Sequence, residues 1–108
     1  MTWKELSEFI EGVNTKLHKE YDSKLSSSEY MLSHFIKLSE EVGELAEQVL
    51  AYNDLQRSTK NMSKDKVALG DEIADVLFTL LLLAKDLDVD IDDALIHKMK
   101  KVKERLHV

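Results

Sequence analysis

The feature that most constrains the fold of this chain is its lack of residues that turn the backbone. The 108 residues include no proline and three glycines, Gly12, Gly43 and Gly70. Sheet proteins need turn residues at short intervals between their strands. Three widely separated glycines cannot supply those turns, so the sequence predicts an all-α protein.

The first two helices are expected from apolar residues that recur at the 3.6-residue helical period. Thr2 is a candidate N-cap, with Glu5 as its capping-box partner. Ser28 is the expected N-cap of a longer helix that runs to about Tyr52. We expect an apolar stripe of this second helix to be buried and a polar stripe beside it to carry ligands. The apolar stripe consists of Met31, Phe35, Leu38, Val42, Leu45 and Val49.

The last two helices lie beyond a polar stretch. Ser63 is the expected cap of a helix over residues 64–87, which is apolar nearly all round between residues 76–84. A helix of that kind is buried on every side, which favours a subunit interface as well as a monomer core. Asp90 is expected to cap the fourth helix. We therefore predict one domain over residues 1–108, a four-helix bundle-like protomer that assembles as a homodimer or a dimer of dimers.

Charge and composition narrow the choice of partners. The formal net charge is -6, which argues against non-specific binding to nucleic acid or to a membrane surface. Because there is no cysteine, the chain has no disulfides and no thiol chemistry. Its longest apolar run is far shorter than the roughly 20 residues that span a bilayer, and its N-terminus lacks the apolar region of a signal peptide. A cytoplasmic protein is therefore expected.

Two pairs of acidic residues lie within the predicted second and third helices. Glu41 and Glu44 are three residues apart, as are Glu72 and Asp75, so each pair shares one helix face. Clustered carboxylates among apolar neighbours are costly to desolvate unless a cation compensates them. Oxygen ligands without Cys or His suit Mg²⁺, with Mn²⁺ as an alternative. The four acids predict a site for one or two divalent metal ions, although a solvated acidic face is the simpler explanation of any single pair.

Spacing rules out a calcium loop and argues against a di-iron site. A calcium loop that begins at Asp86 would have Ile91 at its sixth position and His97 at its twelfth, where an EF-hand needs Gly and Glu. A di-iron bundle needs two copies of Glu-x-x-His. The single copy here joins Glu104 to His107, at the end of the chain.

The segments Glu41-Val42-Gly43-Glu44 and Glu72-Ile73-Ala74-Asp75 together resemble a known family. Their E-x-x-E, spacer, E-x-x-D pattern is similar to that of the MazG-like nucleotide pyrophosphohydrolases of the all-α NTP pyrophosphatase superfamily. The resemblance covers about residues 28–105. It implies Mg²⁺-dependent hydrolysis of a nucleoside triphosphate between the α and β phosphates, which gives a monophosphate and pyrophosphate. Clearance of unwanted nucleotides from the pool is the role that such an activity suggests.

The resemblance also implies roles for individual residues. The four paired acids would be the metal ligands, and Glu40 would support them or orient the attacking water. Lys37, Lys98 and Arg105 would contact the phosphates. Where some relatives carry an Asn in the last segment, this chain has Val102, so the contacts to the base and sugar stay open.

The sequence leaves open which residues recognise the base and whether the chain is an enzyme. Aromatic, imidazole and amide side chains suit a nucleobase, and the candidates are Trp3, Tyr30, His34, Tyr52 and Asn61. The polar stretch at residues 53–63 is either a substrate lid or a surface connection. The alternative to an enzyme is a non-catalytic helical module that binds a nucleotide or a protein.

Overall fold

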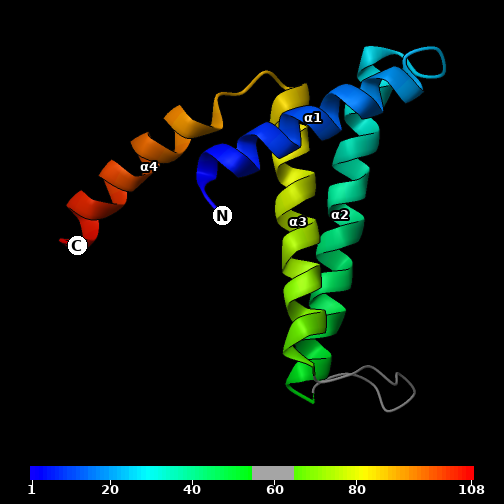
Figure 1. Ribbon diagram of the computed structural model, residues 1–108. Helices are drawn as coiled ribbons and strands as arrows, with labels where there is room; N and C mark the ends of the chain where they lie inside the picture. The colour runs from blue at the N-terminus through cyan, green and yellow to red at the C-terminus, as the bar shows by residue number, and fades with distance from the viewer. Residues whose placement is uncertain (55–64) are drawn as a thin grey trace.

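Four α-helices make up almost all of the fold, as the sequence predicts (Figure 1). The computed structural model describes residues 1–54 and 65–108, and these contain no strand. The helices are α1 (Trp3–Tyr21), α2 (Ser27–Tyr52), α3 (Lys66–Asp86) and α4 (Ile91–Leu106). Most of the predicted 53–63 connection, including Asn61 and Ser63, lies outside the described residues.

Two of the predicted helix caps are confirmed. The Thr2 Oγ1 accepts a hydrogen bond from the amide of Glu5 at 3.1 Å. The Asp90 Oδ1 accepts one from the amide of Asp93, also at 3.1 Å. In both cases a short polar side chain satisfies an amide that has no partner within the helix.

The cap of α2 differs from the prediction, because Ser26 takes the place expected for Ser28. Ser26 and Glu29 form a complete capping box, in which each side chain bonds the other residue's backbone amide. Met31, three residues after Ser28, has no side-chain oxygen with which to complete a capping box. On α3, Asp65 is the cap and accepts from the amide of Val67 at 2.8 Å.

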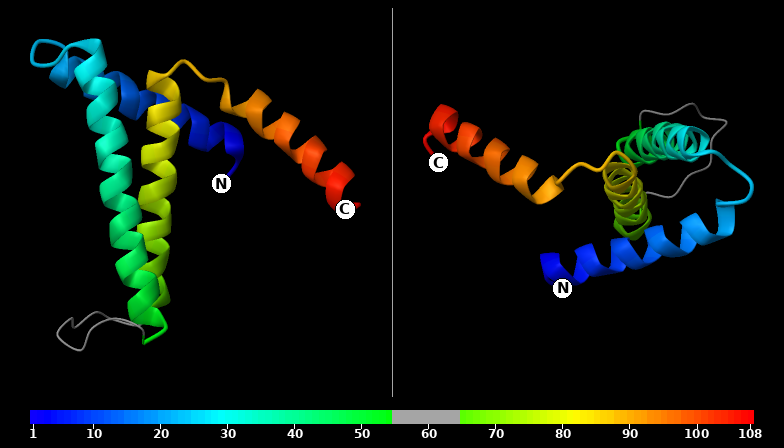
Figure 2. Two further views of the ribbon diagram at one scale, coloured as in Figure 1. Left: turned by 180° about the vertical axis from the view of Figure 1, so that it is seen from behind. Right: turned by 90° about the horizontal axis from the view of Figure 1, so that it is seen from above.

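The helices are arranged as an antiparallel α2–α3 hairpin, with α1 across one end (Figure 2). Helix α4 projects away from the hairpin instead of lying along it, so the arrangement is more open than the four-helix bundle-like protomer that we predicted. The Cα radius of gyration is 17.0 Å, against about 13 Å for a compact domain of this length. The direction of α4 is set by the turn before it, where Asp88 has a φ of 53°, and by a bond of 2.6 Å from Trp3 Nε1 to Asp92 Oδ1.

The seam between α2 and α3 mixes polar and apolar side chains. The α2 residues that are at least partly shielded from solvent recur at alternate spacings of three and four, the pattern of residues at a helix–helix seam. They are Met31, His34, Leu38, Glu41, Leu45, Gln48 and Tyr52, with Tyr30 and Ala51 buried beside them. The corresponding line on α3 includes Leu69, Glu72, Val76, Thr79, Leu83 and Asp86. Lys37, Glu44 and Asp75 are exposed and border this seam.

The apolar stripe predicted to be buried on α2 is only partly at the seam, where Met31, Leu38 and Leu45 are half-buried. The prediction is wrong for this chain at Phe35, Val42 and Val49, which are 56%, 48% and 43% exposed. Because polar residues of the neighbouring stripe share the seam, these three side chains are left on the outside of the hairpin. Few apolar side chains are buried among the described residues: Ile10, Tyr30, Ala51 and Leu83.

Helix α1 docks on the hairpin through a small mixed interface. The rings of Phe9 and Phe78 lie 5.8 Å apart, and Lys85 Nζ on α3 is 2.6 Å from Glu11 Oε2. Ile10 lies between these contacts in the sequence and is buried. Together these contacts hold α1 across the end of α3.

The capping box of α2 makes the first testable prediction. Ser26→Ala should lower the free energy of unfolding by about 1 kcal/mol, because an amide of the first turn loses its partner. Ser28→Ala, two residues away in the same serine run, should change it by no more than a few tenths of a kcal/mol. Urea unfolding followed by circular dichroism measures both, and equal effects would show that Ser26 is not the cap.

The capping box of Ser26 and Glu29 also predicts that the free energy of unfolding depends on pH. The hydrogen bond from the Ser26 backbone lowers the pKa of Glu29 below its usual 4.5. A lowered pKa in the folded state means that the stabilisation is present above about pH 4.5 and is lost as the pH falls through the lowered value. Glu29→Gln should remove this pH dependence when the free energy of unfolding is plotted against pH. An unchanged curve would contradict the assignment.

Candidate metal centre

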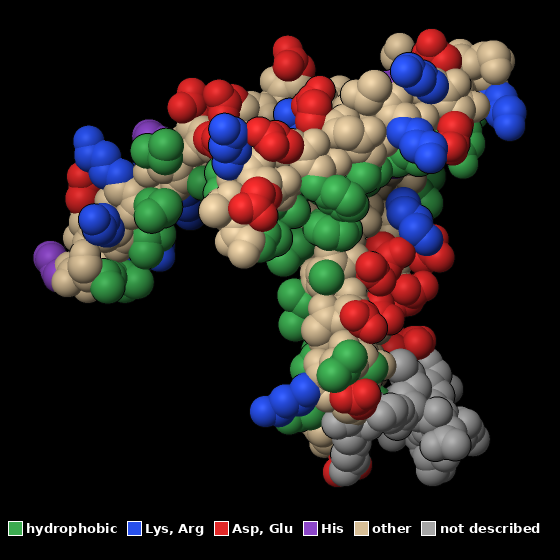
Figure 3. Space-filling view, in the orientation of Figure 1, with side chains coloured by type: hydrophobic (Ala, Val, Ile, Leu, Met, Phe, Trp, Pro, Cys, Tyr) green, Lys and Arg blue, Asp and Glu red, His purple; other side chains and the backbone are tan. Residues whose placement is uncertain are grey.

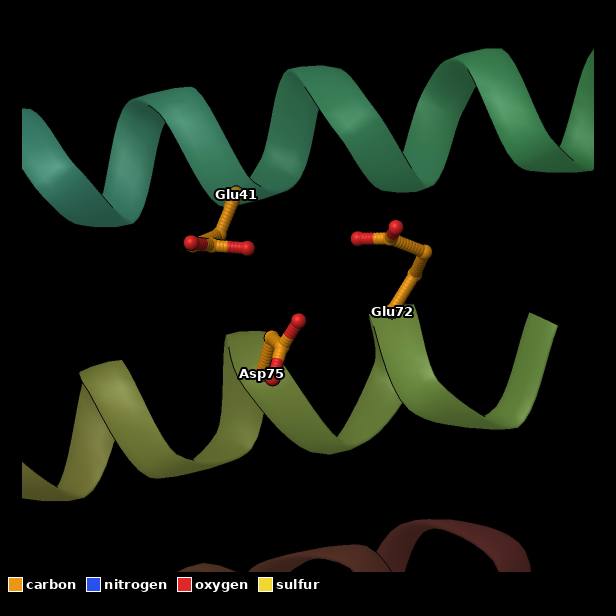
Figure 4. A group of neighbouring side chains, drawn as sticks. All are labelled: Glu41, Glu72 and Asp75. Atoms are coloured by element: carbon orange, nitrogen blue, oxygen red, sulfur yellow. The ribbon is translucent and has the colours of Figure 1, made fainter. Parts of the chain in front are cut away.

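Three carboxylates from the two hairpin helices converge near the middle of the seam (Figure 4). Glu41 comes from α2, and Glu72 and Asp75 come from α3. One carboxylate oxygen from each lies within 4.8 Å of those from the other two. That separation is close to the distance between ligands on opposite sides of an Mg²⁺ ion, twice about 2.1 Å.

Two oxygens of this cluster are buried without a hydrogen-bond partner. They are Glu41 Oε2 and Glu72 Oε2. The side chain of Glu41 is largely buried in the seam, and its other oxygen, Oε1, is 3.2 Å from Lys37 Nζ. A buried carboxylate oxygen without a partner is costly. A cation among the three side chains would relieve that cost, so the donor set fits a hard divalent ion.

Glu44 is the fourth predicted ligand, and it lies outside this group of three. It is exposed on the next turn of α2, and the charge of Glu41 raises its pKa, with smaller contributions from desolvation and from Glu72. The raised pKa shows that Glu44 senses the negative charge of the cluster. Its role as a direct ligand stays a prediction.

Lys37 and Glu40 border the cluster on α2. Lys37 Nζ lies 3.5 Å from Glu40 Oε1 as well as near Glu41. The hydrogen bond with Glu41 and the charge of Glu40 raise the pKa of Lys37, so the ammonium stays charged. A fixed cation at the edge of an acidic centre is suitably placed for a phosphate oxygen, while the role predicted for Glu40 stays untested.

The two cations predicted on the last helix lie elsewhere. Lys98 and Arg105 belong to α4, which extends away from the hairpin. The space-filling view shows acidic side chains gathered along the edge of the hairpin and basic ones on α4, with a gap between them (Figure 3). Within one protomer, the structure does not bring these cations to the carboxylates.

The structure also reveals a polar group that we did not predict. Asp86 pairs with His34 and His18, from two other helices, near the α1 end of the seam. We considered Asp86 as the start of a calcium loop and rejected that loop, so its partners on the other helices were missed. One sequence signal was available, because His34 precedes Glu41 by seven residues and therefore shares its helix face.

The fold and the cluster define a class, an all-helical domain with carboxylates facing each other across an antiparallel helix pair. Residues 30–108 match the sequence profile of the MazG nucleotide pyrophosphohydrolase domain. The chain belongs to this family, which confirms the resemblance seen in its two acidic motifs.

One curated protein is similar to this chain over part of its length. The chain is 35% identical over 74 residues to the uncharacterized protein YpjD of Bacillus subtilis (strain 168). The alignment covers 68% of this chain and 65% of the relative, slightly less than two thirds of its length. No solved structure matches the chain. None of the four described helices combines the length and the apolar character that a bilayer crossing requires.

Metal binding at the cluster can be tested by thermal unfolding. Addition of Mg²⁺ or Mn²⁺ should raise the Tm, because an ion that binds only the folded state stabilises it. Glu41→Gln should abolish this rise while leaving the metal-free Tm unchanged or higher, since one repelling charge is removed. Glu20→Gln, an exposed charge change on α1, should keep the full rise. An equal rise in Glu41→Gln would place metal binding elsewhere.

Proposed function

We propose that this chain is an Mg²⁺-dependent nucleoside triphosphate pyrophosphohydrolase. It would cleave the α–β phosphate bond to give a nucleoside or deoxynucleoside monophosphate and pyrophosphate, with clearance of unwanted nucleotides as its role. The observation that carries the proposal is the cluster of Glu41, Glu72 and Asp75, with two unsatisfied oxygens, in a member of the MazG family.

Residues at and beside the seam would have separate roles in this reaction. Glu41, Glu72 and Asp75 would hold the cation, with Glu44 completing the set. When bound, Mg²⁺ polarises phosphoryl oxygens and lowers the pKa of a coordinated water. In this proposal Glu40 would orient the attacking water, and Lys37 would contact a phosphate oxygen.

Assembly into a homodimer or a dimer of dimers completes the proposal. The outer face of the hairpin exposes Phe35, Val42 and Leu77, and α4 exposes Leu95 and Met99. Exposed apolar surface of this extent on a small protein is typical of a subunit interface. A second copy of the chain would bury both faces.

The same assembly would bring the distant cations to the acidic seam. Lys98 and Arg105 flank the apolar stripe of α4, so docking of α4 on a partner's hairpin carries both charges with it. The basic side chains on α4 and the acidic side chains along the edge of the hairpin are electrostatically complementary. We propose that the active site combines the carboxylates of one protomer with Lys98 and Arg105 of the other.

Turnover is the direct test of the activity. We expect pyrophosphate release from at least one nucleotide in a panel of NTPs and dNTPs, only with Mg²⁺ or Mn²⁺. Glu41→Gln and Asp75→Asn should each lower kcat by about a hundredfold or more, because a lost ligand weakens the charge stabilisation of the transition state. Their helical circular dichroism should match that of the wild type. Metal-dependent nucleotide binding without turnover would favour a non-catalytic module.

Complementation tests the shared site. Glu41→Gln and a Lys98→Ala/Arg105→Ala double variant should each be nearly inactive alone. After they are unfolded and refolded together at equal concentrations, about a quarter of all sites in a random mixture of dimers should be intact. Recovery of that fraction of activity supports the shared site. No recovery, with the mixed dimer confirmed by a tag on one variant, would place all the residues in one protomer.

A further inference from the structure

A second group of titratable side chains lies on the same seam, at the end near α1. The Asp86 carboxylate on α3 pairs with Nδ1 of His34 on α2, and it lies 3.5 Å from Nε2 of His18 on α1. The Asp86 side chain is only 2% exposed. The proposed hydrolysis leaves all three residues without a role.

Aromatic packing holds the His34 ring on a second side. The ring of Tyr30 lies 4.5 Å from that of His34, edge to face, and 4.2 Å from that of His18. Burial, with the nearby charge of Asp86, raises the pKa of Tyr30 to about 12, so the phenol stays neutral. A hydrogen bond and an edge-to-face contact together restrict the rotation of His34.

His34 stands on the same helix face as the candidate metal ligand Glu41. Seven residues separate them, about 10 Å along the axis of α2. Lys37 lies between them, with its Nζ on Glu41. A nucleoside triphosphate bound at the carboxylates and Lys37, and lying along α2 in this direction, would bring its nucleoside close to His34. In the opposite direction the seam is closed by Gln48 and Ala51, which are both buried.

The pairing with Asp86 also fixes the hydrogen-bonding character of the His34 ring. Because the carboxylate accepts from Nδ1–H, the neutral imidazole presents Nε2 as an acceptor. No group among the described residues bonds this nitrogen. The side chain is 13% exposed, so it is partly accessible from the open side of the seam.

We propose that His34 determines specificity in the proposed pyrophosphohydrolase, its Nε2 accepting a hydrogen bond from an O–H or N–H group of the nucleoside. Asp86 is the positioning residue that sets the tautomer and direction of the ring. This inference rests on the proposed function. The donor is either a sugar hydroxyl or an N–H group of the base, and both use the same acceptor.

The test compares His34→Ala with His18→Ala, a variant that loses the other imidazole of the same Asp86. Steady-state kinetics would use ribo-, 2′-deoxy- and 2′,3′-dideoxynucleotides to test the sugar hydroxyls. CTP, with an amino donor at C4, would be compared with UTP, whose N–H donor is at N3 instead. For the nucleotide that carries the donor, His34→Ala should raise KM about tenfold, the effect of one lost hydrogen bond, and change kcat little. For the analogue that lacks the donor it should change neither. His18→Ala should retain the wild-type preference, and His34→Gln should restore part of it.

The outcomes separate the inference from the proposed function. A wild type that turns over nucleotides, with a His34→Ala variant that keeps its sugar and base preferences, would overturn the inference alone. So would an equal loss on every nucleotide, which indicates a structural role. If the wild type turns over no nucleotide, calorimetry instead measures binding of the Mg²⁺–nucleotide panel to the wild type and to His34→Ala. An unchanged nucleotide preference in His34→Ala would again overturn the inference. Asp86→Asn should shift preference in the same direction as His34→Ala.

Discussion

Repulsion among carboxylates in the α2–α3 seam is the constraint on which the rest of the structure depends. A seam between two helices is normally filled with apolar side chains. Here Glu41, Glu72 and Asp75 face each other across it, and the charge of Glu41 is strong enough to raise the pKa of Glu44. The carboxylates therefore repel one another when α2 and α3 pack together, and a bound cation would stabilise the packed hairpin.

The polar residues of the seam also affect which apolar residues are buried. A helix has one face for its neighbour, and on α2 that face is shared between apolar residues such as Leu38 and Leu45 and polar ones such as Glu41 and Gln48. Apolar residues such as Phe35 and Val42 are then left outside. Hydrophobic burial is the main source of folding free energy, and few apolar side chains are buried in the described part of this chain.

Most local features of this chain could be predicted from sequence, and features set by distant contacts could not. The N-caps Thr2 and Asp90 and the all-helical fold depend on neighbouring residues and were predicted correctly, although the cap of α2 was placed at Ser28 instead of Ser26. The two acidic pairs could also be found, because their spacing puts each pair on one face. Which face of α2 meets α3 depends on the partner helix, so burial was assigned to the apolar stripe. The pairing of His34 with Asp86 joins residues 52 positions apart, and no local pattern indicates it.

The position of α4 follows the same electrostatic reasoning in the proposed assembly. If Lys98 and Arg105 packed beside the carboxylates of their own chain, they would neutralise the seam as each protomer folded. They would then compete with the cation for the same oxygens. Supplied by a partner, these charges meet the seam only after assembly, at its edge, where a bound triphosphate needs them. Separating acids and bases between copies would keep the centre free for metal and link catalysis to assembly.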